Sequence, residues 1–492
     1  MITISLPNWV TTLAVFTVLM LLIASVCAAE SISLEEYLAR VQESHPFFKK
    51  EELSKRIALK EQEKHLGDLD WIVSSNPYYV HEESTQDIGF DPHRVDQYGF
   101  DIGAEKKFWS TGGTLGLSYD ITRSDIESND LVFGAITVPA ETSLFHENGL
   151  TLSYSQPLLQ DRGGALSRLE YELQGYSVDA AKIIADENKE QFLLNVGDGF
   201  LDWVFLVEQI RLLENRYSLA REEHERTIKK HRQNLVDKVD VIRARSAVLN
   251  AEQNILLARA NATAKQQELA TIAQIDRFDE YVPEHVIYEF SDIKSIDDAI
   301  AELHLSSRAL DAYELRISQL ELQKTGALEQ GKPRLDLILS SGIRSGDEEF
   351  GDSYGLNRPQ YSASIIYRYP IGNRRATAEA IKAEIETAQV REEMSDTRLR
   401  LESGLRNIVS NMKELRKVLE LNKEQIKISK EKTIAELRRY NQGRIELTFV
   451  IQSRDEEQNV QLLYAQNAIT YHKLFLRYKE LLDELLGRGD KE

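Results

Sequence analysis

The sequence predicts a mainly α-helical fold with a membrane β-barrel, built from two internal repeats. Three observations predict it. The same order of elements, short strands followed by two very long helices, occurs in both halves of the 492-residue chain. The helical stretches are several times longer than ordinary globular helices. Other stretches alternate strictly between apolar and polar residues, as strands with one dry face do. A duplicated unit of this length determines the architecture before any single motif does.

The N-terminal 29 residues carry no charged side chain, and Trp9–Val26 is a nearly unbroken apolar run. This pattern predicts a secretory signal peptide over residues 1–29, cleaved near Ala28 or Ala29. An uncleaved membrane anchor and a lipidated Cys27 stay open as alternatives. Cys27 is the only cysteine of the sequence, so we expect a mature chain without disulfides.

Composition limits the classes of function. Charged residues make up 28% of the chain and the mean hydropathy is −0.39, which suits long solvated helices. The net charge of −20 argues against a nucleic-acid partner, because a phosphate backbone requires a basic face. It fits an acidic surface or a lumen that favours cations. The sequence has no nucleophile elbow, zinc-protease motif or dinucleotide turn, so we expect no enzyme, no metal and no cofactor.

The repeat is clearest where each half turns between its long helices. There, residues 231–245 align with residues 440–454 without a gap. The helical segments that open each half also correspond in sequence. We therefore expect a first structural repeat over residues 30–290 and a second over residues 291–492.

Strands with one apolar face are predicted in both repeats. In residues 114–122 the apolar side chains of Leu115, Leu117, Tyr119 and Ile121 alternate with small or polar ones. Tyrosine is frequent near the predicted strand ends, as in the aromatic girdles of membrane barrels. The predicted strands cover about 98–123 and 149–156 in the first repeat, and about 334–344 and 360–369 in the second.

Four strands per chain cannot close a barrel, and open edges would leave backbone groups unpaired. Three copies would give a twelve-stranded antiparallel barrel with a polar lumen. A soluble sandwich with its apolar faces packed inward is the alternative. An additional hairpin, Tyr98–Trp109 turning at residues 110–113, has no counterpart in the second repeat. It either extends the barrel or caps it.

The long helices predict one helical hairpin in each repeat, over residues 164–275 and 376–486. No proline interrupts residues 164–234, and roughly 70 residues at 1.5 Å each would form a rod of about 100 Å. The returning helix keeps a three-four spacing of small apolar residues, which is typical of a coiled-coil seam with closely approaching helices. These residues are Val241, Ala244, Val248, Ala251, Ile255, Ala258 and Ala262.

Strand-to-helix joints lie at Pro157 and Pro370, a helical tip reads Tyr440-Asn-Gln-Gly443, and the closing helix contains Gln466-Asn-Ala468. In this order along a duplicated chain, these motifs resemble the TolC-like outer-membrane efflux family. The resemblance implies a homotrimer with a barrel in the outer membrane, continued by an α-helical coiled-coil tunnel through the periplasm. It implies a passive exit duct that receives substrate from an inner-membrane transporter through a periplasmic adaptor (membrane fusion protein).

Two alternatives stay open. The duct could serve a type I protein secretion system, because specificity would reside mostly in the pump. A protein of a different class, a non-conducting periplasmic coiled coil, would explain the helices but not the amphipathic strands.

By resemblance, the two helical tips form the periplasmic end. The residues expected to contact the adaptor are Asn234, Leu235, Val236, Gly443 and Ile445, and the alignment of the repeats pairs Asn234 with Gly443. In the family, an aspartate of the first tip bonds an aromatic hydroxyl and an arginine of the second, and this contact holds the entrance shut. The positions here that match this latch and the adjoining constriction are Asp240, Tyr440, Arg444 (beside the aligned Ile445), Phe449 and Gln452.

Overall fold

The computed structural model describes residues 30–84, 92–128, 131–133, 136–138 and 142–486; the predicted signal peptide, with Cys27, lies outside this part. The chain divides into two compact units, and each draws on both halves of the sequence. We call them the helical unit (described residues 30–53, 184–308 and 397–486) and the sheet unit (described residues within 54–183, and 309–396). The division into repeats at residue 290 therefore does not coincide with the compact units, and it stays a prediction.

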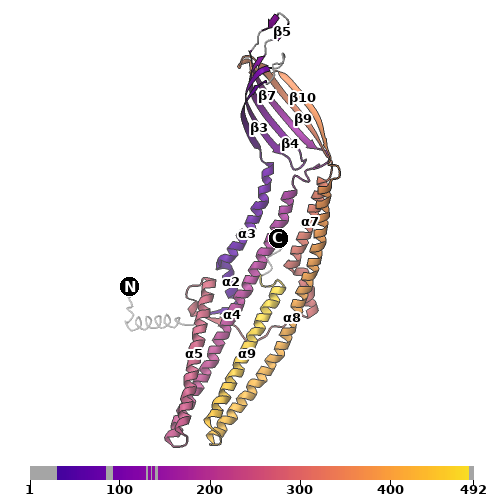
Figure 1. The fold of residues 1–492 in the computed structure, drawn as a ribbon. Coiled ribbons are helices and arrows are strands. Elements are labelled where there is room, and N and C mark those ends of the chain that lie inside the picture. Colours follow the sequence, from indigo (N-terminus) through magenta and orange to yellow (C-terminus); the bar gives the residue numbers. More distant parts are fainter. Residues whose placement is uncertain (1–29, 85–91, 129–130, 134–135, 139–141, 487–492) are drawn as a thin grey trace, which may run out of the picture. The chain divides into compact units, whose positions relative to one another are not determined.

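The helical unit holds both predicted helical hairpins. Its elements are β1 (Glu30–Ser33), α2 (Leu34–Ser44), α5 (Lys238–Ala273), η2 (Phe278–Glu280), β8 (Tyr281–Glu284), α6 (Ile296–Ser306), α9 (Leu447–Leu481) and the larger parts of α4 (Leu169–Arg232) and α8 (Arg374–Asn441). α4 turns back into α5, and α8 turns back into α9 (Figure 1). No helix among the described residues is long and apolar enough to cross a membrane.

Small and apolar side chains hold the helical unit together. Five of the seven predicted seam residues of α5 are buried, namely Ala244, Ala251, Ile255, Ala258 and Ala262. The fully buried Tyr37 on α2 donates a hydrogen bond to the carbonyl of Leu269 at 2.9 Å. Ser33 and Ser295 cap α2 and α6, each accepting from the amide three residues on. β1 pairs in parallel with β8, a long-range contact that the sequence reasoning missed.

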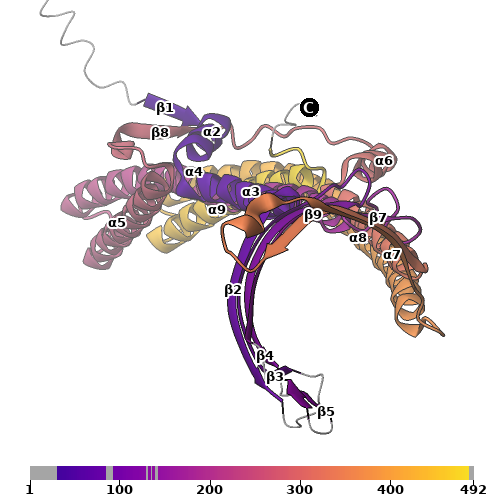
Figure 2. The ribbon, with the colours of Figure 1, turned by 90° about the horizontal axis from the view of Figure 1, so that it is seen from above.

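The sheet unit is organised around one antiparallel sheet in the order β10-β9-β7-β4-β3-β2. Its elements are most of α3 (Pro46–Lys64) and α7 (Arg308–Gln330), η1 (His65–Leu69), β2 (Ile72–Glu83), β3 (Pro92–Lys107), β4 (Thr114–Ser128), β5 (Leu131–Phe133), β6 (Ile136–Val138), β7 (Thr142–Pro157), β9 (Arg334–Asp347), η3 (Asp352–Gly355) and β10 (Arg358–Arg368). The long strands bend together into an arc (Figure 2).

The prediction of four strands per chain is wrong, because the sheet has six strands. The twelve-stranded barrel of three copies stays a prediction. β3 pairs with β4 along its whole length, so the hairpin that begins near Tyr98 extends the sheet. β2 adds a sixth strand beside β3. Strict alternation missed β2 because Pro77 interrupts it and the neighbouring Tyr78 and Tyr79 put aromatic rings on both faces.

Candidate functional site: the helical tips and the two faces of the sheet

The two helical hairpins turn in the same way. In each turn one amide bonds the carbonyl three residues back and the next bonds the carbonyl five residues back, at 2.9–3.0 Å. Asn234 and Gly443 take the left-handed conformation that ends such a helix, with φ of 53° and 71°. Asp237 and Glu446 then lead into α5 and α9 with φ, ψ of −76°, 158° and −78°, 156°. Both pairs are the ones that the sequence alignment matches.

A cavity of about 670 Å³ lies between the two turns. It brings together eight of the predicted tip residues, namely Asn234, Leu235, Val236, Asp240, Tyr440, Gly443, Arg444 and Ile445. Phe449 and Gln452 do not line it. Phe449 is 51% exposed on α9, and Gln452 lines a separate groove of about 610 Å³ between α5 and α9, together with Asn250, Asn254 and Asn459.

Tyr440 is the most enclosed of the predicted tip residues. It is 9% exposed and packs against Ala244, Leu447 and Val450. The Lys230 ammonium lies 4.0 Å from the centre of its ring, a cation–π contact, and donates to Asn441 Oδ1 at 3.1 Å. Burial raises the pKa of the Tyr440 hydroxyl. The nearby Thr227 hydroxyl opposes this rise, and the Asp240 carboxylate adds to it.

The Tyr440 hydroxyl has no hydrogen-bond partner among the described residues. Asp240 instead pairs with Arg243 at 3.4 Å, and the same guanidinium reaches Glu446 of the other tip at 3.4 Å. Arg243, which the sequence reasoning missed, is therefore a second charged link between the tips, in addition to Lys230. The latch between Asp240 and Tyr440 stays a prediction.

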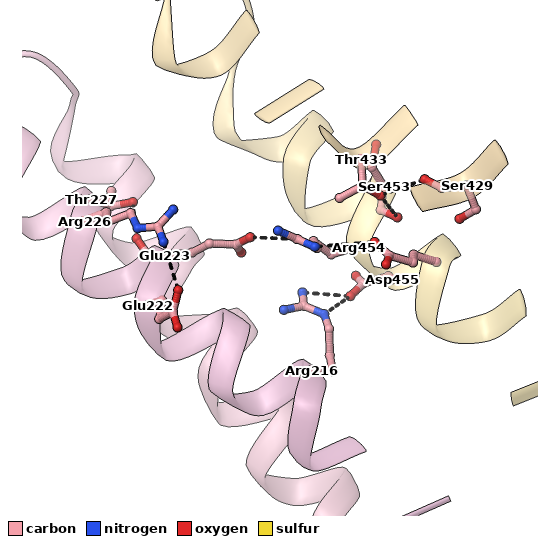
Figure 3. A network of polar contacts seen from close by, with 11 residues as sticks. Arg216, Glu222, Glu223, Arg226, Thr227, Ser429, Thr433, Ser453, Arg454 and Asp455 are labelled. Atoms are coloured by element: carbon pink, nitrogen blue, oxygen red, sulfur yellow. Dashed lines mark hydrogen bonds and ion pairs between the residues drawn. The ribbon is translucent and has the colours of Figure 1, made fainter. Parts of the chain in front are cut away.

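A group of charged residues, of which Arg216 and Glu223 are buried, joins α4 to α9 (Figure 3). The Arg216 guanidinium, on a residue 5% exposed, meets one oxygen of Asp455 at 2.9 and 3.0 Å. Glu223, 7% exposed, accepts from Arg454 at 3.3 Å. These contacts join residues more than 200 positions apart, so they fasten the first hairpin to the second within one chain.

The buried charges are not fully satisfied. Burial raises the pKa of Glu223, and the attraction of Arg216 and Arg454 counteracts this rise. Within the part of the chain that the structure describes, one Glu223 oxygen and one Arg216 nitrogen have no hydrogen-bond partner. Because a low-dielectric interior strengthens electrostatic attraction and raises the cost of an unpaired charge, we expect this network to be sensitive to mutation.

One group of three carboxylates in the described chain has oxygens close enough to share a metal ion: Glu187, Glu190 and Asp483. A protein cation already lies among them. The Arg308 guanidinium bonds Glu187 at 2.8 Å and Asp483 at 3.1 Å, and it also contacts Glu190. The cluster is therefore an arginine-centred ion network, which is its simplest structural role.

The six-stranded sheet has one apolar face. By the strand register, most of its large apolar and aromatic side chains lie on the same side of the sheet. They are 37–79% exposed, so no other element covers them within the described chain. These residues are Tyr79, Tyr98, Phe100, Ile102, Leu117, Leu150, Leu152, Leu339, Ile343, Tyr361, Ile365 and Tyr367.

The opposite face is polar and rich in glycine. Ser74, Asp101, Ser118, Asp120, Thr151, Ser340 and Ser362 lie on it. All six glycines of the long strands, Gly99, Gly103, Gly116, Gly149, Gly342 and Gly346, are on this face too. A Cβ at five of these six positions would come within about 3 Å of a neighbouring side chain or backbone atom. Such crowding belongs to the inner side of a bent sheet.

The strand-to-helix joints lie where the sequence predicts them. Pro157 is the last residue of β7, and Pro370 follows β10 by two positions. After Pro157, the Asp161 carboxylate accepts from the amides of Leu166 and Ser167 at 2.7 and 3.0 Å, which orders the turn before α4. After Pro370, Asn373 with φ of 37° precedes α8.

No protein-family profile and no curated protein matches the chain. Solved structures do. The outer membrane protein VceC from Vibrio cholerae is 11% identical with a TM-score of 0.64, covering 92% of this chain and 96% of its own. CusC, described for its transmembrane channel formation, is 10% identical (TM-score 0.66, 91% of each chain). The open state of the Neisseria gonorrhoeae MtrE outer membrane channel is 13% identical (TM-score 0.61, 93% of each chain). The chain therefore has the fold of outer-membrane channels, and the predicted resemblance is confirmed at the level of the fold.

Proposed function

We propose that this chain is a passive channel of the bacterial outer membrane, in which three copies form a β-barrel continued by a helical tunnel into the periplasm. One observation carries the proposal: a long-stranded sheet with an exposed apolar face opposite a polar, glycine-rich face. An uncovered apolar face of this extent marks a lipid or protein contact. Apolar-out and polar-in strands are the pattern of membrane barrels, and the fold shared with VceC, CusC and MtrE supports the same assignment.

The channel is the exit duct of a tripartite efflux system. It takes substrate from an inner-membrane transporter through a periplasmic adaptor and catalyses no reaction of its own. The tips support this role, because the residues assigned to adaptor contact line one cavity at the end of the helical hairpins. A non-conducting coiled coil would leave the uncovered apolar face of the sheet without a purpose.

Closure takes place at the tips. Among the residues that the structure describes, none hydrogen-bonds the buried Tyr440 hydroxyl, and leaving such a group unbonded costs about 1–3 kcal/mol. The Asp240 carboxylate lines the same cavity, so a small shift of the tips lets it accept from Tyr440 and hold the entrance shut. Opening breaks this contact, biased by an adaptor that binds the open state more tightly than the closed one.

The experiment that tests the channel is planar-bilayer conductance of the detergent-extracted protein, with the native mass measured on the same sample. A trimer with small, mostly closed and cation-selective channels supports the proposal. A monomeric or dimeric rod without conductance overturns it and favours the coiled-coil alternative.

The gate is tested in the same assay. Asp240→Ala should raise the single-channel conductance or the open fraction. Asp237→Ala is the matched control, because Asp237 lines the same cavity but makes no capping bond. If the two variants have the same conductance and open fraction, the proposed latch is wrong, and the proposed channel function is unaffected.

A further inference from the structure

We infer that β2 and β3 are wall strands of the proposed barrel, and that the free edge of β2 pairs with the free edge of β10 from a second copy of this chain. The inference rests on the proposed channel function and deepens it. Each copy then contributes six strands to the wall, so three copies close eighteen strands.

The apolar face runs without a break from β4 onto the β2–β3 hairpin. Along the β3–β4 ladder, Phe100 lies opposite Ile121, Ile102 opposite Tyr119, and Ala104 opposite Leu117. Tyr79 of β2 stacks near Tyr98 of β3, with ring centres 4.7 Å apart. If the hairpin capped the barrel or folded into its lumen, this apolar surface would be exposed to water.

The polar face continues across the same hairpin. The Tyr78 ring lies over Gly99, where an added Cβ would come within 2.1 Å of it. Its hydroxyl reaches Thr122 of β4 at 3.4 Å. One side chain thus crosses three strands on the inner face, which fixes the register of β2 and β3 against β4.

The apolar belt also ends at the same level on the hairpin as on β4. Just beyond Tyr79 and Tyr98, Asp96 accepts from the Tyr79 hydroxyl at 2.7 Å and pairs with Arg94 at 3.1 Å. Arg94 in turn pairs with Glu127 of β4 at 3.3 Å. Where a strand of a membrane barrel passes from lipid into water, aromatic side chains are followed by charged ones. The hairpin therefore crosses the same depth as the rest of the sheet.

The two edges of the sheet fit each other. Every neighbouring pair in the sheet is antiparallel, so across six strands β2 and β10 run in opposite directions. They are 12 and 11 residues long. When two copies stand side by side, β10 of one meets β2 of the other as an antiparallel pair with matching apolar and polar faces. Pro77 on β2 and Pro359 on β10 are the two residues of these strands that lack an amide donor.

Unpaired edges are not tolerated in lipid, because each unsatisfied backbone group there costs several kcal/mol. Within the described chain the remaining sheet-unit strands, β5 and β6, have three residues each and pair with one another. They are too short to cover either edge. A second copy offers a strand of the right length, direction and faces.

The consequence is a wide outer-membrane end. Barrel diameter grows roughly linearly with strand number, and barrels of 16–18 strands leave an open aqueous channel. Selection by size would then fall to the helical tips and not to the barrel.

The test is disulfide cross-linking between copies. Cys27 is the only native cysteine, so Cys27→Ser gives a clean background. Val73→Cys, Ser75→Cys or Tyr79→Cys on β2 is combined in turn with Tyr361→Cys, Ala363→Cys or Ile365→Cys on β10. All six positions lie on the apolar face, so opposed pairs come within disulfide range. The matched control set replaces the β2 position with Leu117→Cys on β4.

We expect at least one β2–β10 pair to give covalent dimers and trimers on non-reducing gels, and the β4–β10 set to give none. Cross-links in the β4–β10 set, or a conducting trimer without β2–β10 cross-links, would overturn the six-strand wall and leave the channel function intact. A native mass of a single chain would overturn the channel proposal itself.

Discussion

Arg308 holds three carboxylates together, and its removal should destabilise the helical unit strongly. In Arg308→Ala, oxygens of Glu187, Glu190 and Asp483 remain within 4.8 Å of one another without their cation. The Glu190 and Asp483 side chains are 2% and 14% exposed, so water screens them poorly. At an effective dielectric constant of 20, each such pair repels by roughly 3–4 kcal/mol. Removing one partner from a buried ion pair costs about 3–5 kcal/mol in practice.

The assay is thermal unfolding of the detergent-extracted protein, followed by circular dichroism at 222 nm. For a unit of roughly 150–250 residues, each kcal/mol lowers the Tm by about 2–4 °C, so Arg308→Ala should lower it by roughly 6–20 °C. Arg316→Ala is the control. That residue lies on the same helix, is exposed, and bonds only a neighbouring glutamine in the described chain. It should change the Tm by less than about 2 °C.

Calcium distinguishes lost charge balance from lost packing. Ca²⁺ accepts oxygen ligands at 2.3–2.6 Å, and carboxylate oxygens within 4.8 Å of one another can reach a single ion. Millimolar CaCl₂ should therefore restore part of the Tm of Arg308→Ala and leave that of the native protein unchanged. The electrostatic reasoning is wrong if Arg308→Ala and Arg316→Ala have the same Tm. It is also wrong if Ca²⁺ does not reduce the decrease in Tm that Arg308→Ala causes.

Three further predictions concern the helical unit. Glu223→Ala should lower the Tm by several degrees, because Arg454 loses its hydrogen bond to Glu223 and the buried Arg216 loses a nearby opposite charge. Glu222→Ala, which breaks an exposed pair, should shift the Tm by about 1 °C. Equal shifts of the two variants would refute this reasoning. Burial lowers the pKa of His285 to about 4 and also lowers that of His472. Their stabilising effect is therefore complete above pH 6.5 and decreases as the pH falls toward 4, and replacing both by glutamine should flatten the Tm between pH 7.5 and 5. Gly443→Ala, at φ of 71° with open space around it, should cost about 1 kcal/mol from backbone strain alone, seen as a lower Tm.

The helices and their tips could be predicted from the sequence because their determinants are local. A three-four spacing of alanines specifies a close helix seam wherever the helix lies, and five of the seven predicted seam residues are buried. A residue able to take positive φ, placed between two periodic segments, specifies the turn. Asn234 and Gly443 both meet this condition, so the alignment of the repeats correctly located two identical turns.

The contacts between the hairpins could not be predicted in the same way. Arg216, Glu223 and Arg454 lie among other charged residues at spacings that fit an exposed helix face equally well. Only the packing of α4 against α9 buries them, and those helices are about 240 positions apart in sequence. The role of Arg243 could not be predicted for the same reason. Its spacing from Asp240 indicates an ordinary pair within one helix, and its contact with Glu446 arises only because the second tip lies beside it.

The strands show what a search for apolar alternation overlooks. Such a search considers only the apolar face of a strand. It does not find β2, because aromatic rings lie on both faces of that strand. The opposite face carries its own signal, since Gly99, Gly116, Gly149 and Gly342 each leave room for a side chain of a neighbouring strand. Glycine weakens a strand, so its confinement to one face is costly unless the sheet must bend toward that face. A period-two pattern of glycine opposite an apolar stripe thus predicts both curvature and its direction. In residues 92–107, where Gly99 and Gly103 alternate with Phe100 and Ile102, this pattern indicates a strand of the bent sheet. β3 then requires a partner on its far side, and the preceding residues 72–83 are the nearest segment long enough to supply one.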